Sequence, residues 1–483
     1  MQSSGVKFGT SGARGLAVEM TDLVCYTYTK GFLQYLEQTG EISKNGETVA
    51  IAGDLRPSTQ RIMTAVARAA ADMGYTPLNC GYIPSPAVAL YGIENRCPAI
   101  MVTGSHIPAD RNGIKFNKAS GEVLKTDEAG IVSQAVEVAD GTLDSPYEMP
   151  AEDPTAGRTY VARYLNAFSA DCLAGKKIGI YQHSAVGRDM LVEIFSGLGA
   201  EVVPLGRSDT FIPVDTEAIR EEDVALAKQW SDEQGFDTIL STDGDSDRPL
   251  VSDENGEWLR GDIAGILAAR YLGADSVSTP VSCNTALEKT GWFADVRRTK
   301  IGSPFVVASM IEATRAGHTG VVGYEANGGF LTNSDLQVPG KEKQGCRLSL
   351  PALPTRDAVL PVLSIILLSI QEGTTISGLL KDLPQRFTVS DRIQNFPTEE
   401  SAKILAQFEK TEAIEAAFGE MFGKVESVDR TDGLRVTFEA QEILHMRPSG
   451  NAPEFRCYNE AASQARVLEM QQQSMDILLR LKG

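Results

Sequence analysis

The chain has 483 residues, a formal net charge of −19 and 42% hydrophobic residues, a composition typical of globular rather than disordered proteins. Non-specific binding to nucleic acid or anionic lipid needs a basic surface, so the charge argues against both classes of partner. A phosphorylated small molecule is not excluded, because a local basic pocket can lie within an acidic protein. At roughly 100–200 residues per domain, the length predicts three or four domains.

Neither a membrane span nor a disulfide framework is indicated by the sequence. The longest apolar run, residues 358–370, is shorter than the roughly 20 residues that a span needs and is interrupted by Pro361, so we expect a buried helix there. The N-terminal sequence lacks the basic start and apolar stretch of a signal peptide. The seven cysteines are scattered and form no CxxC pair, which favours a reducing cytoplasm and no zinc ribbon.

Strands followed by helices recur along the first three quarters of the chain. Ser58 is the expected N-cap of the first of these helices, and Gly74 marks its end. In chain order, we expect strands at 48–52, 98–102, 177–181, 201–204, 236–240 and 320–323, and helices at 58–73, 190–198, 263–271 and 358–370.

The last hundred residues follow a different pattern. Alternating apolar residues predict strands at 434–438 and 455–458, and a helical pattern covers 460–481. We therefore predict three α/β domains and a C-terminal α+β domain, with limits at 1–148, 149–257, 258–376 and 377–483.

The first loop that could carry chemistry begins where the strand at 98–102 ends. Open α/β sheets bind ligands just beyond the carboxyl ends of their strands. Ser105 offers a hydroxyl, His106 a titratable neighbour and Lys115 a cation, a set that suits a covalent phosphate carrier. Taken alone, a Ser-His pair is more often part of an ordinary polar turn.

The second loop carries Asp243, Asp245 and Asp247 at alternating positions directly after a predicted strand. Three such carboxylates repel one another, and a hard cation is the usual remedy. A calcium loop with Glu254 at its twelfth position is one alternative, although Arg248 stands where that loop needs glycine. A solvated acidic turn without a metal is another. Arg248 adds a cation that suits a phosphoryl group.

Three further loops combine glycine with polar side chains. In GYEANGG, Glu325 and Asn327 offer an acceptor and a mixed donor–acceptor for adjacent sugar hydroxyls, although alone the segment would be read as a glycine turn. In FGTSGARG, Arg14 is the one charged residue. The segment RPSGNAPEFR could form an anion-binding nest from Arg447, Ser449, Asn451 and Arg456.

These five segments, in this order, resemble the α-D-phosphohexomutase family. The loop at Ser105 resembles that family's Thr-(Ala/Gly)-Ser-His-x-Pro signature. The segments DGDSDR, GYEANGG, RPSGNAPEFR and FGTSGARG resemble its magnesium, sugar-binding, phosphate-binding and N-terminal arginine loops. The motifs run from residue 8 to residue 456, so the resemblance covers essentially the whole chain. It implies four domains around a central cleft, three with related mixed α/β sheet cores and a C-terminal α+β domain.

The resemblance also implies a reaction and a set of residue roles. The family interconverts hexose 6-phosphates and hexose 1-phosphates through a phosphoserine enzyme and a hexose 1,6-bisphosphate, which also activates the dephosphorylated enzyme. Ser105 would carry the phosphoryl group, with His106 and Lys115 as acid–base groups. Carried over residue by residue, Mg²⁺ would bind Ser105, Asp243, Asp245 and Asp247; Arg14 and Arg248 would steady the transferring group; Glu325 and Asn327 would hold the sugar; and Arg447, Ser449, Asn451 and Arg456 would bind the other phosphate.

Departures from the family pattern leave the sugar open. Asn327 stands where bacterial phosphomannomutase/phosphoglucomutase enzymes often have serine, and a Glu-Ala-Asn loop also occurs in N-acetylglucosamine-phosphate mutases. Ile107, Ser246 and Ser303 replace the asparagine, glycine and histidine of many relatives. Mannose or glucose phosphates are the expected substrates. Amino-sugar phosphates, a metal-dependent sugar-phosphate phosphatase and a calcium-dependent sugar-binding protein are the alternatives.

The partners expected are therefore small sugar phosphates, with no nucleic acid and no membrane, and the sequence says nothing about oligomeric state. The predicted site collects several cations and a metal although the chain is acidic. We expect a basic cleft within an acidic shell, formed by Arg14, Lys115, Arg248, Arg447 and Arg456.

Overall fold

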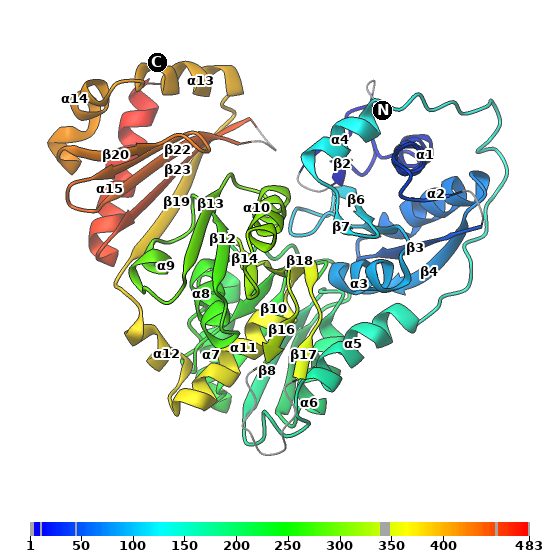
Figure 1. Ribbon diagram of the computed structural model, residues 1–483, viewed down its shortest axis with the longest axis horizontal. Helices are drawn as coiled ribbons and strands as arrows, with labels where there is room; N and C mark the ends of the chain where they lie inside the picture. The colour runs from blue at the N-terminus through cyan, green and yellow to red at the C-terminus, as the bar shows by residue number, and fades with distance from the viewer. Residues whose placement is uncertain (1–3, 10–11, 44–45, 339–347, 450–452, 482–483) are drawn as a thin grey trace. The chain divides into compact units, whose positions relative to one another are not determined.

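A computed structural model of the chain describes residues 4–9, 12–43, 46–338, 348–449 and 453–481 (Figure 1). The chain divides into two compact units. The first contains Met1–Val277 and Ser303–Leu380, and the second contains Ser278–Gly302 and Lys381–Gly483. The exact domain limits given above remain a prediction.

The N-terminal part of the first unit is a mixed sheet with helices on both faces (Figure 1). Its strands lie in the order β1-β2-β6-β5-β3-β4, with β7 paired to β6; β5, β3 and β4 are mutually parallel, and β6 runs antiparallel to β5. The elements are β1 (Lys7–Phe8), β2 (Gly12–Leu16), α1 (Asp22–Thr39), β3 (Thr48–Gly53), α2 (Thr59–Asp72), β4 (Thr76–Tyr82), α3 (Ser85–Asn95), β5 (Ala99–Val102), β6 (Arg111–Lys118), β7 (Gly121–Glu122) and α4 (Lys125–Val132).

The next part of the first unit repeats the strand–helix pattern around a four-stranded sheet. Its strand order is β11-β10-β8-β9, with β10, β8 and β9 parallel and β11 antiparallel to β10. The loop that carries Asp243, Asp245 and Asp247, which we call the aspartate loop, connects β10 to β11 at the carboxyl end of a buried strand. The elements are α5 (Thr155–Ala167), β8 (Lys177–His183), α6 (Arg188–Gly197), β9 (Glu201–Arg207), α7 (Glu221–Gln234), β10 (Thr238–Thr242) and β11 (Pro249–Val251).

The third segment centres on the apolar helix α11, which packs against α8. Pro361 is tolerated in α11 because it lies in the first turn, where backbone N–H groups need no helical partner. In the first unit, β14 pairs with β15 and β15 with β18, all antiparallel. The elements are α8 (Gly261–Tyr271), β12 (Ser276–Pro280), α9 (Ala286–Lys289), β13 (Asp295–Thr299), α10 (Ser303–Arg315), β14 (Val321–Tyr324), β15 (Phe330–Thr332), β16 (Leu336–Val338), β17 (Leu348–Leu350), β18 (Leu353–Asp357), α11 (Val359–Glu372), α12 (Ile376–Leu379) and the 3-10 turn η1 (Leu380–Asp382).

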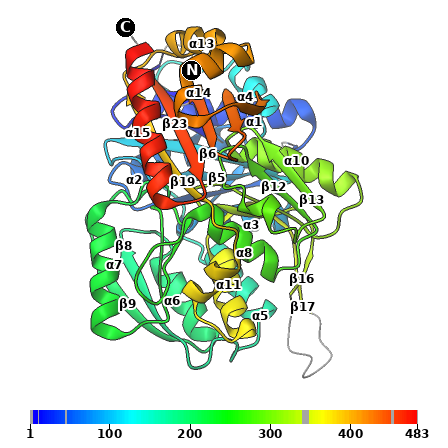
Figure 2. The ribbon, with the colours of Figure 1, turned by 90° about the vertical axis from the view of Figure 1, so that its left-hand side faces the viewer.

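The C-terminal part of the second unit is an antiparallel sheet covered by helices on one face. The strand order is β19-β23-β22-β21-β20, and α15 lies along β19 and β23 (Figure 2). Its core is rich in phenylalanine, including Phe396, Phe418 and Phe455. The elements are β19 (Phe387–Gln394), α13 (Thr398–Gln407), α14 (Thr411–Phe422), β20 (Val425–Asp429), β21 (Leu434–Phe438), β22 (Ile443–Pro448), β23 (Glu454–Ala461) and α15 (Gln464–Leu481).

The predicted strands and helices are present, although the strand expected at 236–240 is β10 (Thr238–Thr242), and two further local corrections are needed. Ser58 precedes α2 but makes no capping bond, because its hydroxyl accepts a hydrogen bond from Asn112 Nδ2 at 2.9 Å instead. The C-terminal helix begins at Gln464 rather than at residue 460, because Glu460 and Ala461 continue the ladder with β19 and β22.

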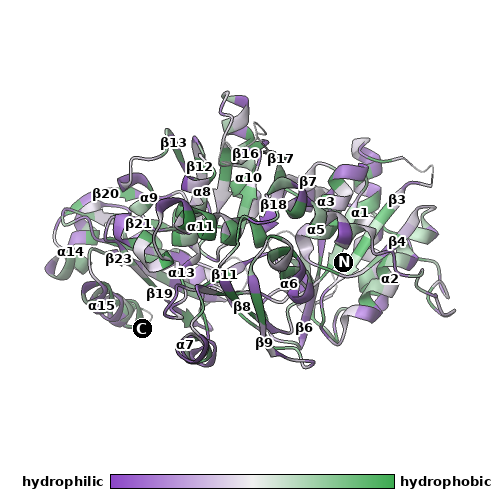
Figure 3. Cartoon of the chain, turned by 90° about the horizontal axis from the view of Figure 1, so that it is seen from below, coloured by the Kyte–Doolittle hydropathy of each residue, from purple (hydrophilic) through white to green (hydrophobic). Residues whose placement is uncertain are grey.

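Hydropathy follows burial in these elements. Figure 3 draws α11 and β3 largely in the green of hydrophobic residues, whereas α7 carries much purple. Within the described part of the chain, no single helix has the length and apolarity of a membrane span; the bent pair Val359–Glu372 and Ile376–Asp382 meets that test by length and composition alone.

Candidate active site

The loop between β5 and β6 holds Ser105 at a strained backbone position. Its φ is +55°, in the left-handed region that residues with side chains rarely occupy. The side chain is buried, and its hydroxyl donates a hydrogen bond to Asp243 Oδ2 at 2.5 Å. The backbone N–H of Ser105 donates to Thr103 Oγ1 at 2.7 Å, which fixes the turn. A hydroxyl held in one place against a carboxylate suits a nucleophile.

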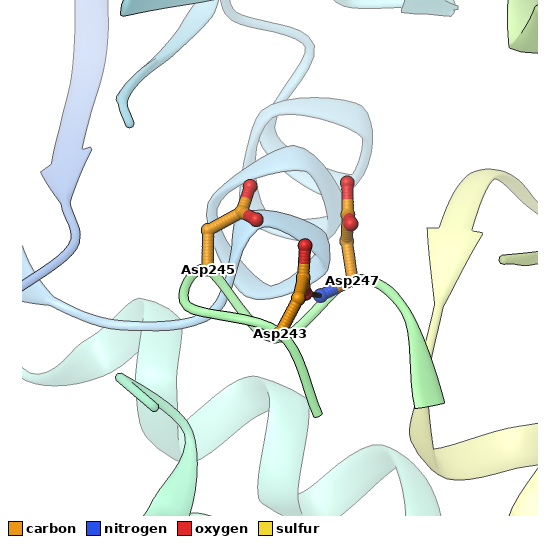
Figure 4. Close-up of side chains that lie close together, drawn as sticks. All are labelled: Asp243, Asp245 and Asp247. Atoms are coloured by element: carbon orange, nitrogen blue, oxygen red, sulfur yellow. Dashed lines mark hydrogen bonds between the residues drawn. The ribbon is translucent and has the colours of Figure 1, made fainter. Parts of the chain in front are cut away.

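The three aspartates of the second loop come together in a buried cluster. Asp243, Asp245 and Asp247 point to the same side of their loop, with one ligand oxygen from each lying within 4.8 Å of the others (Figure 4). The Oδ1 atoms of Asp245 and Asp247 are buried and accept no hydrogen bond from any residue that the structure describes. Buried oxygens without donors are costly unless something else satisfies them, and carboxylates are the ligands that Mg²⁺ and Ca²⁺ prefer. The residues present therefore fit a divalent metal.

Lys115 balances part of this negative charge. Its Nζ lies 2.5 Å from Asp245 Oδ2 and 2.6 Å from Asp247 Oδ2. Burial lowers the pKa of Lys115, but these two carboxylates outweigh it and raise the pKa above its ordinary value. Burial alone would raise the pKa of the Asp245 carboxyl, but the charge of Lys115 outweighs burial and holds that pKa below its ordinary value. Asp243 gains less from Lys115: burial and repulsion by Asp245 and Asp247 raise its pKa well above the ordinary value.

Two small residues allow the serine loop and the aspartate loop to meet. A Cβ on Gly244 would lie 2.8 Å from the Ser105 carbonyl oxygen and 3.1 Å from the Phe211 ring. Ser246 has a φ of +56°, which explains why glycine is common there in the family pattern. Its hydroxyl offsets the strain by accepting from Gly187 N and Thr242 Oγ1, each at 2.9 Å. Ser246 therefore takes the backbone conformation of glycine, and its hydroxyl is held by two hydrogen bonds.

His106 is placed to accept rather than to donate a hydrogen bond. Its Nδ1 lies 2.9 Å from Arg248 Nη1 and 3.3 Å from Ser105 Oγ. An arginine only donates, so Nδ1 must be unprotonated and the imidazole neutral. Burial and the charge of Arg248 lower the pKa of His106 to about 3, in agreement with this tautomer.

Three arginines, Arg14, Arg248 and Arg356, accompany the aspartate cluster, and Arg356 lies outside the predicted motifs. Burial and the charges of Arg248 and Arg356 lower the pKa of Arg14 to about 10. The buried Nε atoms of Arg14 and Arg248 donate no hydrogen bond to any described residue. Buried cations with unused donors suit an anion such as a phosphoryl group. Arg356 lies on β18 without a motif around it, so the sequence carried no signal for it.

The sugar loop lies beside the aspartates through Arg356. Arg356 Nε lies 2.5 Å from Glu325 Oε2, and its Nη1 lies 4.0 Å from Asp247 Oδ2. Asn327 is buried; its carbonyl accepts from Thr216 Oγ1 at 2.6 Å and its Oδ1 accepts from Gly329 N. The structure thus brings together the predicted serine, metal, arginine and sugar loops of the first unit. Ser303, which stands where many relatives have histidine, donates its hydroxyl to Glu122 Oε2 at 2.6 Å.

The calcium-loop alternative loses its last ligand in the structure. Glu254 accepts from the hydroxyl of Ser377 at 2.5 Å and from its backbone N–H at 3.2 Å. A calcium loop would need that carboxylate to join the aspartates as a bidentate ligand. Glu254 is therefore a structural acceptor, and the aspartate loop is not a calcium loop of that type.

In the second unit, strand pairing places three arginines in a row. Arg447 on β22 lies opposite Arg456 on β23, which lies opposite Arg392 on β19. We call these three residues the arginine row. Opposed residues share a sheet face, and core residues such as Phe455 and Met446 occupy the other one. Like charges across strands destabilise a sheet, so the row is suited to an anion. Arg392 was missed because only the strand register reveals it.

Nearby carboxylates hold this row in place. Arg447 Nε lies 3.2 Å from Asp432 Oδ1, and Arg456 Nη2 lies 3.2 Å from Glu454 Oε2. The backbone N–H of Ser449 donates to the carbonyl of Glu454 at 2.8 Å. Asn451, the remaining predicted phosphate ligand, lies outside the described residues.

In the first unit, the protein side chains alone do not give the site the positive charge expected of a basic cleft. Protein side chains alone nearly balance there, because Arg14, Lys115, Arg248 and Arg356 accompany Asp243, Asp245, Asp247 and Glu325. A positive excess in this part of the site therefore depends on a bound cation.

Family models and known proteins agree with this arrangement. The four models of phosphoglucomutase/phosphomannomutase match in order: alpha/beta/alpha domain I over residues 5–140, domain II over 158–256, domain III over 260–387, and the C-terminal domain over 394–477. A phosphomannomutase of Salmonella muenchen is 44% identical over 466 residues, which is 96% of this chain and 94% of that protein.

Solved structures share the fold. A putative phosphomannomutase from Thermus thermophilus superposes with a TM-score of 0.75 at 19% identity, covering 99% of both chains. An Aspergillus fumigatus N-acetylphosphoglucosamine mutase, solved in complex with GlcNAc-6P and magnesium, superposes with a TM-score of 0.56 at 17% identity, covering 92% of this chain and 85% of that one. The predicted four-domain fold class is confirmed, and the chain belongs to the phosphoglucomutase/phosphomannomutase family of phosphohexomutases.

Proposed function

We propose that the chain interconverts the 6-phosphate and 1-phosphate of mannose and glucose through phosphorylated Ser105. The observation that carries the proposal is the buried Ser105 hydroxyl, 2.5 Å from Asp243 in a cluster of three carboxylates. The 44% identity to a phosphomannomutase supports the choice of sugar. Phosphoryl transfer needs positioning and charge neutralisation above all, and both are what these loops supply.

The transfer itself can be written with its atoms balanced. Phosphorylated Ser105 gives its phosphoryl group to the free hydroxyl of a hexose phosphate: the bond from phosphorus to Ser105 Oγ breaks, and one to the sugar oxygen forms. The proton that the sugar hydroxyl loses passes to the acid–base group that gives one to Ser105 Oγ, so the protons also balance. The resulting hexose 1,6-bisphosphate turns over and returns its other phosphoryl group to Ser105. A dephosphorylated chain would need this bisphosphate as activator.

The remaining residues take roles that their geometry suits. Lys115, whose Nζ lies between Asp245 and Asp247, is a candidate for the group that supplies the proton that Ser105 Oγ receives. His106, whose Nδ1 lies 3.3 Å from Ser105 Oγ, is the second candidate acid–base group, and by accepting from Arg248 it also positions that arginine. Arg14, Arg248 and Arg356 would hold the transferring phosphoryl group, and Glu325 and Asn327 the sugar hydroxyls.

We assign the metal site to Mg²⁺, held by Asp243, Asp245, Asp247 and an oxygen of phosphorylated Ser105. When bound, this ion would neutralise negative charge on the transferring group. The substrate's other phosphate would be bound by Arg447, Ser449, Asn451 and Arg456. Arginine suits this task, because its fork recognises the phosphate and not the sugar attached to it.

We also propose a cytoplasmic location and small sugar phosphates as partners. The six cysteines among the described residues are free, which fits a reducing compartment. The acidic chain disfavours polyanionic partners such as nucleic acid, whereas a small sugar phosphate needs only a local basic site.

The proposal is tested by supplying mannose, glucose, glucosamine and N-acetylglucosamine 6-phosphates side by side, with Mg²⁺ and trace hexose 1,6-bisphosphate. We expect the 1-phosphates of mannose and glucose, detected by phosphorus NMR, without accumulation of inorganic phosphate. Product from the amino sugars alone would move the assignment to an amino-sugar mutase. Steady release of inorganic phosphate without isomerised sugar would instead identify a phosphatase.

A further inference from the structure

One buried arginine outside the predicted site touches the serine loop at four backbone carbonyls. Arg56 lies in the turn between β3 and α2 and is 3% exposed. Its Nη2 donates to the carbonyls of Ser105 at 2.8 Å and Ile107 at 2.5 Å. Its Nη1 donates to those of Pro108 at 2.6 Å and Arg111 at 3.0 Å. One guanidinium thus spans the whole loop from the proposed nucleophile to the start of β6.

The same guanidinium is itself fixed from two sides. Its Nε donates to Asp54 Oδ2 at 3.1 Å, and its Cζ lies over the Phe211 ring, 4.2 Å from the ring centroid. Asp54 Oδ2 also accepts from Thr103 Oγ1 at 2.7 Å, and that hydroxyl in turn accepts from Ser105 N. Asp54 and Arg56 therefore hold Ser105 by both its N–H and its carbonyl.

The loop needs such a partner for physical reasons. Ser105 is held at a φ of +55°, which is strained for a residue with a side chain and persists only where surrounding contacts over-determine it. Carbonyls that turn inward at a buried loop also require donors. Gly104 leaves the space for this, because a Cβ there would lie 2.6 Å from Arg56 Cζ.

We propose that Arg56 is a positioning residue for phosphoryl transfer: it sets the conformation of the Ser105 loop without touching the substrate. This inference rests on the proposed role of Ser105. Phe211 extends the effect, because it packs both on Arg56 and beside Gly244 of the aspartate loop, so one contact aligns the nucleophile with the metal ligands.

The test compares Arg56→Lys and Arg56→Ala with the unchanged chain. Lysine keeps the charge beside Asp54 but cannot serve four carbonyls in a plane. We expect kcat to fall about 100-fold, the cost of a misplacement of about 1 Å, while KM changes less than about threefold. Transfer of phosphate from glucose 1,6-bisphosphate to Ser105, followed by intact mass, should slow by the same factor as kcat.

Arg466→Ala is the matched control, because Arg466 also holds a carbonyl and carboxylates, those of Met421, Glu442 and Glu469, and packs by Phe422. It should lose stability and keep kcat. Arg56→Lys that unfolds at the same temperature as the unchanged chain and keeps kcat within about threefold would overturn the inference. Failure of the unchanged chain to phosphorylate Ser105 would overturn the proposed function instead. If Arg56→Ala does not fold, Arg56→Lys alone decides.

Discussion

The reacting centre in the first unit and the arginine row in the second unit bind charge in opposite ways. Ser105, Asp243 and Asp245 are fully buried, whereas the side chains of Arg456 and Arg392 are 31% and 49% exposed. Buried charges interact strongly and are held before any ligand arrives, whereas exposed charges are screened and can adapt. The first region is therefore suited to chemistry that needs a fixed geometry, and the second region is suited to an anion whose position varies.

Apart from the loss of Ser105 itself, the largest effect should follow from removing one buried charge of the reacting centre. Asp245→Asn leaves Lys115 with one carboxylate partner and the metal with one fewer anionic ligand. Because loss of mere outer-shell partners costs about 10–100-fold, we expect metal affinity by calorimetry, and turnover, to fall by more than about 100-fold. Asp237→Asn, which removes a half-exposed partner of Lys176, should leave both unchanged. Equal metal affinity in the two variants would contradict a metal site at the aspartates.

The next effect comes from geometry alone. Gly244→Ala introduces a Cβ too close to the Ser105 carbonyl oxygen, so the serine and aspartate loops must separate. We expect kcat to fall by about 100-fold with little change in KM, since the arginine row is untouched. Gly419→Ala in α14 serves as control, because its Cβ would meet only Glu415 Cβ at an ordinary 3.5 Å. Normal turnover of Gly244→Ala would show that the close approach of the two loops does not matter.

The arginine row should respond in KM rather than in kcat. Arg447 is 11% exposed and oriented by Asp432. Its substitution by glutamine should raise KM about tenfold, which is the worth of a charge-assisted hydrogen bond. The same substitution at the more exposed Arg392 should raise KM about threefold. Both increases in KM should be smaller at high salt. A fall in kcat without a rise in KM for either variant would remove the distinction between the two regions.

The smallest effect on turnover is expected from His445, which lies two residues before Arg447 on β22 and therefore on the same face of the sheet as the arginine row. Burial lowers its pKa to about 4, below the ordinary value of 6.5, and its Nε2 contacts the Asp432 carbonyl. Between these two values the unfolded chain binds a proton that the folded chain does not. The free energy of unfolding therefore falls as pH drops from about 6.5 to 4, by up to about 1.4 kcal/mol per pH unit.

His445→Gln should remove that part of the slope in denaturant titrations at pH 7, 6 and 5. His183 in the first unit, whose pKa burial likewise lowers to about 4, offers the same test for the other region. An unchanged slope in His445→Gln would mean that this histidine is not buried in its neutral form.

Local patterns predicted the elements that depend on neighbouring residues. The β3 and β10 strands, the α11 helix and the loops at Ser105 and Asp243 all follow from apolar runs ended by glycine and polar residues. The start of α15 was wrong because Glu460 also suits a helix, and only pairing with β19 keeps it in a strand. Ser58 stands at the predicted N-cap position, but it makes no side-chain capping hydrogen bond, and its hydroxyl instead accepts from the distant residue Asn112.

Residues that act through tertiary contacts could not be predicted. Arg56 and Arg356 lie in segments without a recognisable motif, and their roles appear only when four carbonyls or Glu325 surround them. Arg392 requires the register of β19 against β23. Glu254, which sequence spacing placed at a calcium loop, is taken by Ser377. Spacing along the chain identified the chemistry, and only the fold identified what holds it.

The most direct test of the account is the phosphorylation of Ser105. The unchanged chain, treated with glucose 1,6-bisphosphate and Mg²⁺ and then digested, should carry one phosphoryl group, located on Ser105 by mass spectrometry. Ser105→Ala should carry none and lose at least about 10⁴-fold in turnover. A phosphoryl group on another residue, or undiminished labelling of Ser105→Ala, would contradict the central claim that the buried hydroxyl beside Asp243 carries the phosphate.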